Sequence, residues 1–421
     1  MGALTSLLDL PISEQESRGL IFTPREIAQQ PKTWRQTALF FETQLERFQD
    51  FLERTGVTAP LERRPIVMLI GAGTSDFIGE SLALLLRQRW GCEASAVAST
   101  DLLPNMSEYV IPGRRYLWIS FSRSGDSPEG VNVLEQALEV YPEISHLVVT
   151  CNPNSRMVGL AANHPHVCTA VLDDAVNDRS LAMTSSFTNM VVFGQCLAHA
   201  WSFAEYKPIL EGMIEASNKF LSESAELSQR IASRRTRRIC MIGSGSLAAV
   251  AKEASLKVLE MSGGQVKTMP QTSLGLRHGP MVALDRDTDL VCFLSSERTR
   301  FRYEVDLLRE IQAKKITATC VVVGLQSSEA EIVPLCDTYH SIDGSFPDVY
   351  RPPVDVIFGQ LLGLYSSIAF GLKPDAPSPA GVISRATSRS TAENGMAGAK
   401  NSSPRRAATQ FFRHCQVATN S

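Results

Sequence analysis

Three charged side chains recur at helical spacing in the segment Lys252-Glu253-Ala-Ser-Leu-Lys257-Val-Leu-Glu260. Positions i, i+4 and i+7 share one face of a helix, so Glu253, Lys257 and Glu260 are predicted to stand side by side. The neighbouring residues are apolar, which indicates a mostly buried helix. A buried carboxylate beside a cation is suited to proton transfer, whereas the same spacing on an exposed helix gives an ordinary Glu–Lys pair. Both interpretations are open at this point.

A histidine follows in the loop Arg277-His278-Gly279-Pro280. Imidazole titrates near neutral pH, so a loop histidine can serve as an acid or a base. A surface position without function is the more common case for such a residue, and the loop alone does not establish a catalytic role.

Hydroxyl groups gather in a second segment, Ile119-Ser120-Phe-Ser122-Arg123-Ser124-Gly-Asp-Ser127-Pro128. A strand followed by hydroxyls and a helix N-terminus is suited to a phosphate monoester. Ser127-Pro128 is also an ordinary pair of N-cap and first helical residue. Thr74-Ser75 and Thr184-Ser185-Ser186 are similar turns. Three such turns at one sheet edge favour a polar ligand there.

The turn at Gly71-Ala-Gly73 follows a buried strand and invites a comparison with dinucleotide-binding proteins. Their fingerprint requires a third small residue where this chain has Asp76, and the Asp76 carboxylate would oppose a pyrophosphate. The P-loop pattern is absent from the sequence. The turn therefore does not indicate a nucleotide cofactor.

Apolar runs alternate with helical segments in both halves of the chain. The expected strands are 66–70, 116–121, 146–150, 168–172, 239–242, 290–294 and 319–323, with helices such as 131–140 and 303–311 between them. This alternation predicts an α/β fold in which each half is a doubly wound parallel sheet flanked by helices. The turns at Gly71 and Gly243 are 172 residues apart, which indicates an internal duplication.

We divide the chain into an N-terminal helical arm (1–45), a first α/β domain (46–210), a second (211–380) and a tail (381–421). In the arm, Thr23-Pro24 is predicted to be an N-cap followed by Pro at the first helical position. The tail is expected to be disordered, because residues 384–409 are rich in Ser, Thr, Ala, Gly and Arg and have few large apolar side chains.

The composition excludes several classes of partner. The chain has 41 Lys and Arg against 44 Asp and Glu, and only 7% of its residues are aromatic, so nothing favours nucleic acid or an anionic membrane. The apolar run 354–372 is expected to be a buried helix, although a membrane span is the alternative. Nine scattered cysteines without a C-x-x-C pair fit a reducing compartment, and we expect a cytoplasmic protein. His164-Pro165-His166 lacks further ligands in a metal pattern, so no metal or other cofactor is expected.

Four longer motifs accompany these turns. They are Arg25-Glu-Ile-Ala-Gln-Gln-Pro-x-x-Trp34, Asn177-Asp-Arg-Ser-Leu-Ala-Met-Thr-Ser-Ser-Phe-Thr188, Leu276-Arg-His-Gly-Pro280 and Gly371-Leu-x-Pro-Asp-x-Pro-Ser-Pro379. With the two glycine turns and the hydroxyl-rich segment, they resemble the double sugar isomerase (SIS) domain family over residues 20–385. The likeness is greatest to its branch of galactosamine-6-phosphate deaminases and tagatose-6-phosphate ketose-aldose isomerases.

The resemblance implies tandem SIS domains and a role for each candidate residue. The phosphate of a sugar would be held by Thr74, Ser75, Ser122, Arg123, Ser124 and Ser127, with Arg123 at the position where the related synthases have Gln. Glu260 would be the base that moves a proton between C1 and C2. Lys257 would be an accessory cation, Glu253 an orienting group and His278 the acid/base of ring opening. Sites in such proteins often form between subunits, which implies a homodimer or larger oligomer with His278 acting in trans.

The implied reaction is the conversion of galactosamine 6-phosphate and water to tagatose 6-phosphate and ammonia. A simple aldose–ketose isomerase and a non-catalytic sugar-phosphate sensor are the alternatives. A glutamine-dependent synthase is disfavoured, since no cysteine precedes Cys92. The chain departs from the family after Gly381-Val-Ile-Ser-Arg385, where a valine-rich strand is expected and Ala-Thr-Ser-Arg-Ser-Thr follows instead.

Overall fold

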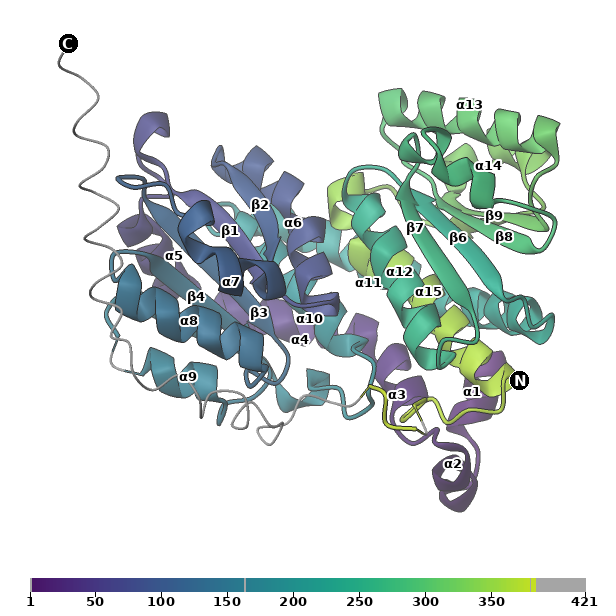
Figure 1. The fold of residues 1–421 in the computed structure, drawn as a ribbon, viewed down its shortest axis with the longest axis horizontal. Helices are drawn as coiled ribbons and strands as arrows, with labels where there is room; N and C mark the ends of the chain where they lie inside the picture. Colours follow the sequence, from purple (N-terminus) through teal and green to yellow (C-terminus); the bar gives the residue numbers. More distant parts are fainter. Residues whose placement is uncertain (1, 163, 379, 384–421) are drawn as a thin grey trace, which may run out of the picture.

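Each half of the chain forms one five-stranded parallel sheet, which confirms the predicted α/β architecture (Figure 1). The computed structural model describes residues 2–162, 164–378 and 380–383. The first sheet has the order β2-β1-β3-β4-β5 and consists of β1 Ile66–Gly71, β2 Ala94–Ala98, β3 Tyr116–Ser122, β4 Ser145–Thr150 and β5 Val167–Val171. The second has the order β10-β9-β8-β6-β7 and consists of β6 Arg238–Gly243, β7 Lys267–Thr272, β8 Thr288–Phe293, β9 Thr319–Leu325 and β10 Thr338–Ile342.

The two sheets match residue by residue at their centres. Ile70 of β1 lies opposite Ser120 of β3, and Ile242 of β6 lies opposite Cys292 of β8. Both residues of the second pair follow those of the first by 172 positions, which is also the spacing of the two glycine turns. We call residues that differ by this spacing equivalent.

Three strands, β2, β7 and β10, are absent from the sequence-based expectation. All three are edge strands of their sheets. β2 is mostly alanine and β7 contains Pro270, a residue that is tolerated only at a sheet edge. Short strands of this composition lack the continuous apolar run that marks a buried central strand.

A layer of helices between the sheets joins the two halves (Figure 1). The helices of the first half are α6 Thr74–Trp90, α7 Ser99–Tyr109, α8 Pro128–Val140, α9 Arg156–Ala161 and α10 Ser185–Ala198. The long α11 Phe203–Ser233 leads to α12 Ser246–Met261, α13 Arg298–Lys314, α14 Glu329–Ile332 and α15 Pro352–Ala369. The short 3-10 helices are η1 Leu61–Arg63, η2 Asp174–Val176, η3 Gly275–Arg277, η4 Pro280–Ala283, η5 Gln326–Ser328, η6 Val333–Leu335 and η7 Asp348–Tyr350.

The central helices α6, α10, α12 and α15 pack on one another, and a single apolar cluster runs through both halves. Every residue of α10 is buried, and so are residues 352–367 of α15. The apolar run 354–372 is therefore mostly a buried helix, as expected. Within the described part of the chain, no helix combines the length and apolar character that a membrane crossing requires.

The N-terminal arm consists of α1 Ala3–Leu8, α2 Ile12–Arg18, α3 Thr23–Ala28, α4 Gln30–Thr43 and α5 Leu45–Thr55. The prediction that Thr23 caps a helix is wrong: α3 begins at Thr23 itself, and Phe22 precedes it. The acceptor at this helix start is the Asp375 carboxylate, which receives the N–H groups of Ile21, Phe22 and Thr23. The cap comes from the opposite end of the chain, so no local pattern could reveal it.

The domain boundaries at residues 45, 210 and 380 stay predictions. The tail from residue 384, which includes Arg385, lies outside the described residues.

Candidate active site

A pocket of about 250 Å³ opens at the carboxyl ends of β1 and β3. The predicted phosphate ligands Ser75, Ser122, Arg123, Ser124 and Ser127 all line this pocket. Thr74, the remaining predicted ligand, precedes Ser75 at the start of α6. The structure therefore brings the predicted hydroxyl groups of two separate turns to one place.

The turn after β3 holds its hydroxyls in position through backbone contacts. Ser122 Oγ accepts the N–H of Gly125 at 3.1 Å, and Ser124 Oγ accepts the N–H of Asp126 at 3.2 Å, so both hydroxyls keep their own proton available for a ligand. Gly125 has φ 61°, and a Cβ there would lie 2.4 Å from Ser155 Oγ, so the turn requires glycine.

Ser127 precedes α8 as predicted, but its side chain makes no capping hydrogen bond. The Ser127 hydroxyl lies in the pocket wall instead. Ser127 and Pro128 are therefore the N-cap and first helical residue, as the alternative interpretation predicts, but the Ser127 hydroxyl is not used to cap the helix.

Arg123 is buried, with 8% of its surface exposed. Its Nη1 donates to the carbonyls of Ser180 and Leu181, each at 3.3 Å. These two contacts hold the guanidinium against one wall of the pocket.

The third hydroxyl-rich turn does not reach the pocket, contrary to expectation. Thr184 and Ser186 donate their hydroxyls to the Asp178 carboxylate, and Ser185 donates to the carbonyl of Glu26. Met183 lines the pocket from this turn instead. The hydroxyls are used to begin α10, a fully buried helix that has to satisfy its own terminus.

Sequence reasoning missed Ser99 and Ser120, which also line the pocket. The Ser99 hydroxyl is buried and has no hydrogen-bond partner among the described residues. Ser99 directly follows β2, so the rule that found the other hydroxyls would have found it if this alanine-rich strand had been recognised.

The predicted charged face of α12 points toward the start of α6. Lys257 Nζ donates to Thr74 Oγ1 at 2.9 Å and to Glu260 Oε2 at 2.6 Å, and it lies 3.5 Å from Glu253 Oε1. The side chains of Lys257 and Glu253 are 1% and 0% exposed, whereas that of Glu260 is 27% exposed. The helix is therefore buried at this face, and Glu260 is the carboxylate that solvent or a ligand can reach.

Burial raises the pKa of the Glu253 carboxyl from its ordinary value of 4.5 to about 8, with Lys257 opposing and Glu260 adding to the rise. Burial acts to lower the pKa of Lys257, but the carboxylates of Glu253 and Glu260 outweigh it and hold this pKa above its usual value. Lys257 is thus a persistent cation. Arg123 also acts on Lys257 electrostatically, which places the α12 charges near the pocket.

His278 is the predicted residue that the chain does not bring to the site. It follows η3 and is exposed. Its ring makes no hydrogen bond or ion pair with any residue that the structure describes, and it does not line the pocket. A single chain thus assembles Glu253, Lys257 and Glu260 with the hydroxyl pocket and leaves His278 apart.

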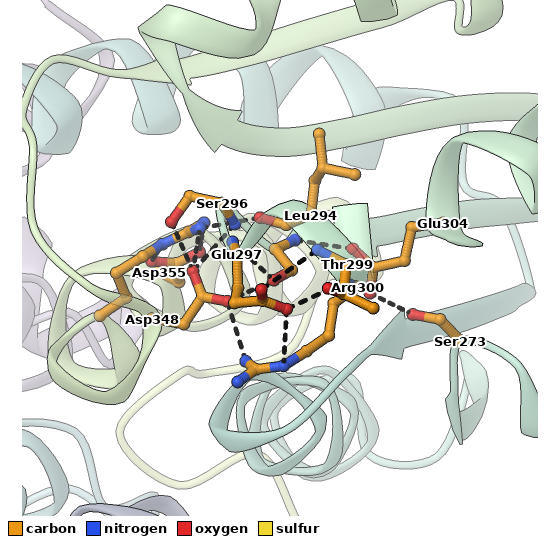
Figure 2. Close-up of polar contacts among 11 residues, drawn as sticks. Ser273, Leu294, Ser296, Glu297, Thr299, Arg300, Glu304, Asp348 and Asp355 are labelled. Atoms are coloured by element: carbon orange, nitrogen blue, oxygen red, sulfur yellow. Dashed lines mark hydrogen bonds and ion pairs between the residues drawn. The ribbon is translucent and has the colours of Figure 1, made fainter. Parts of the chain in front are cut away.

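At the equivalent edge of the second sheet, the donors of the turn are paired with the chain's own carboxylates (Figure 2). Asp348 of η7 accepts the Ser295 hydroxyl, the N–H of Ser296 at 2.9 Å and the Ser296 hydroxyl at 2.7 Å. Arg300 and Arg351 donate to Asp348 at 3.1 and 3.2 Å. This carboxylate therefore occupies the hydroxyl turn of the second sheet.

Two further carboxylates complete that edge (Figure 2). Glu297 accepts the N–H groups of Thr299 and Arg300 at the start of α13, each at 3.1 Å. Glu304 accepts the N–H of Ser295 at 2.7 Å and the Ser273 hydroxyl at 2.7 Å. At the first edge the turn hydroxyls face the pocket, whereas the turn donors of the second edge are paired with carboxylates of the chain itself.

Comparison with known proteins gives consistent results. The SIS domain model matches residues 61–200. A candidate D-galactosamine-6-phosphate deaminase of Streptomyces coelicolor is 33% identical over 375 residues, which are 87% of this chain and 93% of that protein. The D-galactosamine-6-phosphate deaminase AgaS of Escherichia coli O157:H7 is 31% identical over 378 residues, which are 86% of this chain and 93% of that protein.

Solved structures agree with the sequence relatives. The crystal structure of a candidate tagatose-6-phosphate ketose/aldose isomerase from Clostridium novyi NT is similar with a TM-score of 0.83 at 27% identity. The similarity covers 90% of this chain and 96% of that one, so both sheets and the helices between them are shared.

Proposed function

This chain belongs to the SIS domain family of sugar-phosphate enzymes, in the branch of the D-galactosamine-6-phosphate deaminases, and we propose that it converts galactosamine 6-phosphate and water to tagatose 6-phosphate and ammonia. The observation that carries this proposal is the contact of Lys257 with Thr74 at 2.9 Å, which joins the acid–base face of α12 to the hydroxyl pocket of the first sheet.

The pocket at β1 and β3 is proposed to hold the phosphate. Ser75, Ser122, Ser124 and Ser127 offer hydroxyl protons, and Arg123 offers a cation, so a dianionic phosphate monoester would be bound by charge-assisted hydrogen bonds. With the phosphate fixed there, the carbon chain of the sugar extends toward α12, where Glu260 is the exposed carboxylate.

Reaction begins with opening of the sugar ring, in which the C1 hydroxyl loses a proton and the ring oxygen gains one. His278 is proposed to carry out this exchange from the partner subunit, because it is exposed and has no side-chain partner in its own described chain. The product is an open-chain aldehyde with an amino group on C2.

Glu260 then takes the proton from C2, and the C–H electron pair forms a C1=C2 double bond while the C1 carbonyl oxygen takes a proton from solvent and becomes a hydroxyl. Return of the proton from Glu260 to C1, with loss of one N–H proton to solvent, gives an imine at C2. Water adds to this imine carbon, and ammonia leaves as the C2 ketone forms. Lys257 lies 2.6 Å from Glu260 and would stabilise the negative charge that develops near the carbonyl.

Ammonia release tests the proposal. Purified protein is incubated with galactosamine 6-phosphate, glucosamine 6-phosphate or N-acetylgalactosamine 6-phosphate, and ammonia and ketose phosphate are measured for wild type and Glu260→Gln. Ammonia from the galacto substrate alone, lost in the variant, is the expected result. Absence of turnover, with the sugar phosphates still raising Tm, would instead identify a sugar-phosphate sensor.

An aldose–ketose isomerase is the second candidate, favoured by the similarity to the Clostridium novyi structure. The same C1–C2 proton transfer on a substrate with a C2 hydroxyl gives the ketose without ammonia. Conversion of galactose 6-phosphate to tagatose 6-phosphate at a rate above that of galactosamine 6-phosphate would assign the chain to this reaction.

The placement of His278 across a subunit boundary requires a homodimer or larger oligomer. Mixing inactive His278→Ala chains with inactive Glu260→Gln chains, after dissociation and reassembly, tests it. A hybrid contains one site with both intact residues if His278 acts in trans, so activity should return. No recovery from verified hybrids would place both residues in one chain.

We also place the reaction in the cytosol, in keeping with the free and fully buried thiols of Cys196, Cys240 and Cys292.

A further inference from the structure

Arg123 contacts a short loop, residues 178–184, that borders the pocket. Glu26 of the N-terminal arm forms hydrogen bonds with the same loop. Glu26 of α3 is buried with 6% of its surface exposed. Its Oε1 accepts the N–H of Arg179 at 2.5 Å and the N–H of Ser180 at 3.2 Å. Its Oε2 accepts the Ser180 hydroxyl at 2.5 Å. One carboxylate therefore fixes two successive peptide groups.

The pocket side of the same loop carries the acceptors for Arg123. The Ser180 and Leu181 carbonyls each receive Arg123 Nη1 at 3.3 Å. The N–H of Leu181 in turn donates to the carbonyl of Asp375 at 3.0 Å. Glu26 and Arg123 thus contact opposite sides of one stretch of backbone, and any rotation of these peptides would move the guanidinium.

We propose that Glu26 is a positioning residue for the phosphate site: it fixes the backbone of residues 179–181, so that the Ser180 and Leu181 carbonyls hold Arg123 in the pocket. This inference rests on the proposed function, in which Arg123 binds the sugar phosphate. It accounts for a feature of the sequence that the reaction itself leaves unexplained. The motifs at 25–34, 177–188 and 371–379 are far apart in the chain, and the structure joins all three around this loop.

Binding of inorganic phosphate and of the sugar phosphate, measured by calorimetry, tests the inference together with steady-state kinetics. Glu26→Ala should raise the Kd for inorganic phosphate and the KM by about tenfold, the value of a hydrogen bond to a charged group, while kcat changes much less. Glu26→Gln keeps an acceptor for the two N–H groups, so it should recover most of the lost affinity.

Thr37→Val is the matched control. Thr37 is also a buried polar residue of the arm, and its hydroxyl donates to Asn189 Oδ1 at 2.7 Å, away from the pocket. This variant should lower Tm without changing the phosphate Kd. If Glu26→Ala behaves in the same way, Glu26 is only a structural residue and the inference is wrong.

A double-mutant cycle with Arg123→Ala separates this inference from the proposed function. If Glu26 acts through Arg123, Glu26→Ala should have no further effect on phosphate affinity in the Arg123→Ala background. An equal loss in both backgrounds overturns the inference and leaves the phosphate site standing. Unchanged phosphate affinity in Arg123→Ala alone overturns both.

Ser180→Ala gives a second approach in case Glu26→Ala does not fold. It removes one of the three hydrogen bonds to Glu26 from the loop side. A loss of phosphate affinity of about threefold is expected, near the lower range for a single hydrogen bond. Affinity equal to wild type in a folded Ser180→Ala protein contradicts the role of this contact.

Discussion

The turn at Ser124 and the turn at Ser296 occupy equivalent places in the two sheets, 172 residues apart, but their hydroxyls face different partners. The Ser124 hydroxyl lines an open pocket with a buried arginine beside it. The Ser296 hydroxyl donates to the Asp348 carboxylate, which two arginines also contact. The duplicated fold has thus left the turn hydroxyls of one edge facing a pocket and has paired those of the other edge with its own acidic side chains.

The two central helices α12 and α6 also differ in the residues that they carry at equivalent positions. The equivalents of Glu253, Lys257 and Glu260 on α6 are Ser81, Leu85 and Gln88. Gln88 borders a pocket of about 300 Å³ at the second edge, so that pocket has no carboxylate at the position of the proposed base. Both edges share the strand–turn–helix geometry, but the Glu–Lys–Glu set lies on α12 and its equivalents on α6 are Ser, Leu and Gln, so we expect chemistry at the first edge.

The largest effect on kcat is expected from changing Glu260, and its equivalent Gln88 provides the comparison. Glu260→Gln should lower kcat by about 10²–10⁴-fold, because it removes the group proposed to take the C2 proton. Gln88→Glu adds a carboxylate at the equivalent position of the second edge and should leave kcat unchanged. Ammonia release measured for both variants checks this. Equal activity of Glu260→Gln and wild type would remove Glu260 from the mechanism.

The next largest effect is expected from removing the carboxylate that accepts the serine and arginine donors of the second edge. Asp348→Ala should lower the free energy of unfolding by about 3–5 kcal/mol, because it leaves buried arginine and hydroxyl donors without their acceptor. Asp348→Asn keeps the shape and separates the effect of charge from that of packing. Urea unfolding measures both. A loss below about 1 kcal/mol, the range of exposed ion pairs, would mean that water replaces this carboxylate readily.

Smaller effects are expected for the two equivalent serines, on phosphate affinity in one case and on stability in the other. Ser124→Ala should weaken phosphate binding by several-fold, about 1 kcal/mol, with little change in stability. Ser296→Ala should lower stability by about 1–2 kcal/mol, the value of a hydrogen bond to a charged acceptor, with phosphate affinity unchanged. Calorimetry and thermal unfolding on both proteins test the pair. The reverse assignment would show that the second edge binds the phosphate.

The last prediction concerns pH. Burial raises the pKa of Glu253 to about 8 in the folded chain, whereas its ordinary value is 4.5. The folded state therefore keeps a proton that the unfolded state releases, and stability should fall as the pH rises from about 4.5 to about 8. Glu253→Gln cannot ionise and should flatten this part of the profile. Unfolding by urea at several pH values measures the slope, and identical slopes for both proteins would contradict the prediction.

The central strands could be predicted because each is a continuous apolar run followed by a turn. The edge strands β2 and β7 could not, since alanine and proline carry no such signal. This also affects the predicted site, because Ser99, which lines the pocket, can be recognised as a turn residue only if β2 is recognised first. Spacing also placed Glu253, Lys257 and Glu260 on one face correctly, since helical periodicity is a local property.

Other features were decided only by contacts between distant segments. The duplicated α/β fold, the hydroxyl-rich turn and the charged helix face can be predicted from the sequence, because strand, turn and helix preferences act over a few residues. Which hydroxyls line the pocket depends on tertiary contacts, since those of Thr184, Ser185 and Ser186 are used to begin a buried helix. Tertiary contacts also bring Asp348 to the hydroxyls of the second edge and Glu26 to the loop that contacts Arg123. Most buried donors are paired with an acceptor, and the folded chain can supply that acceptor from residues far away in sequence.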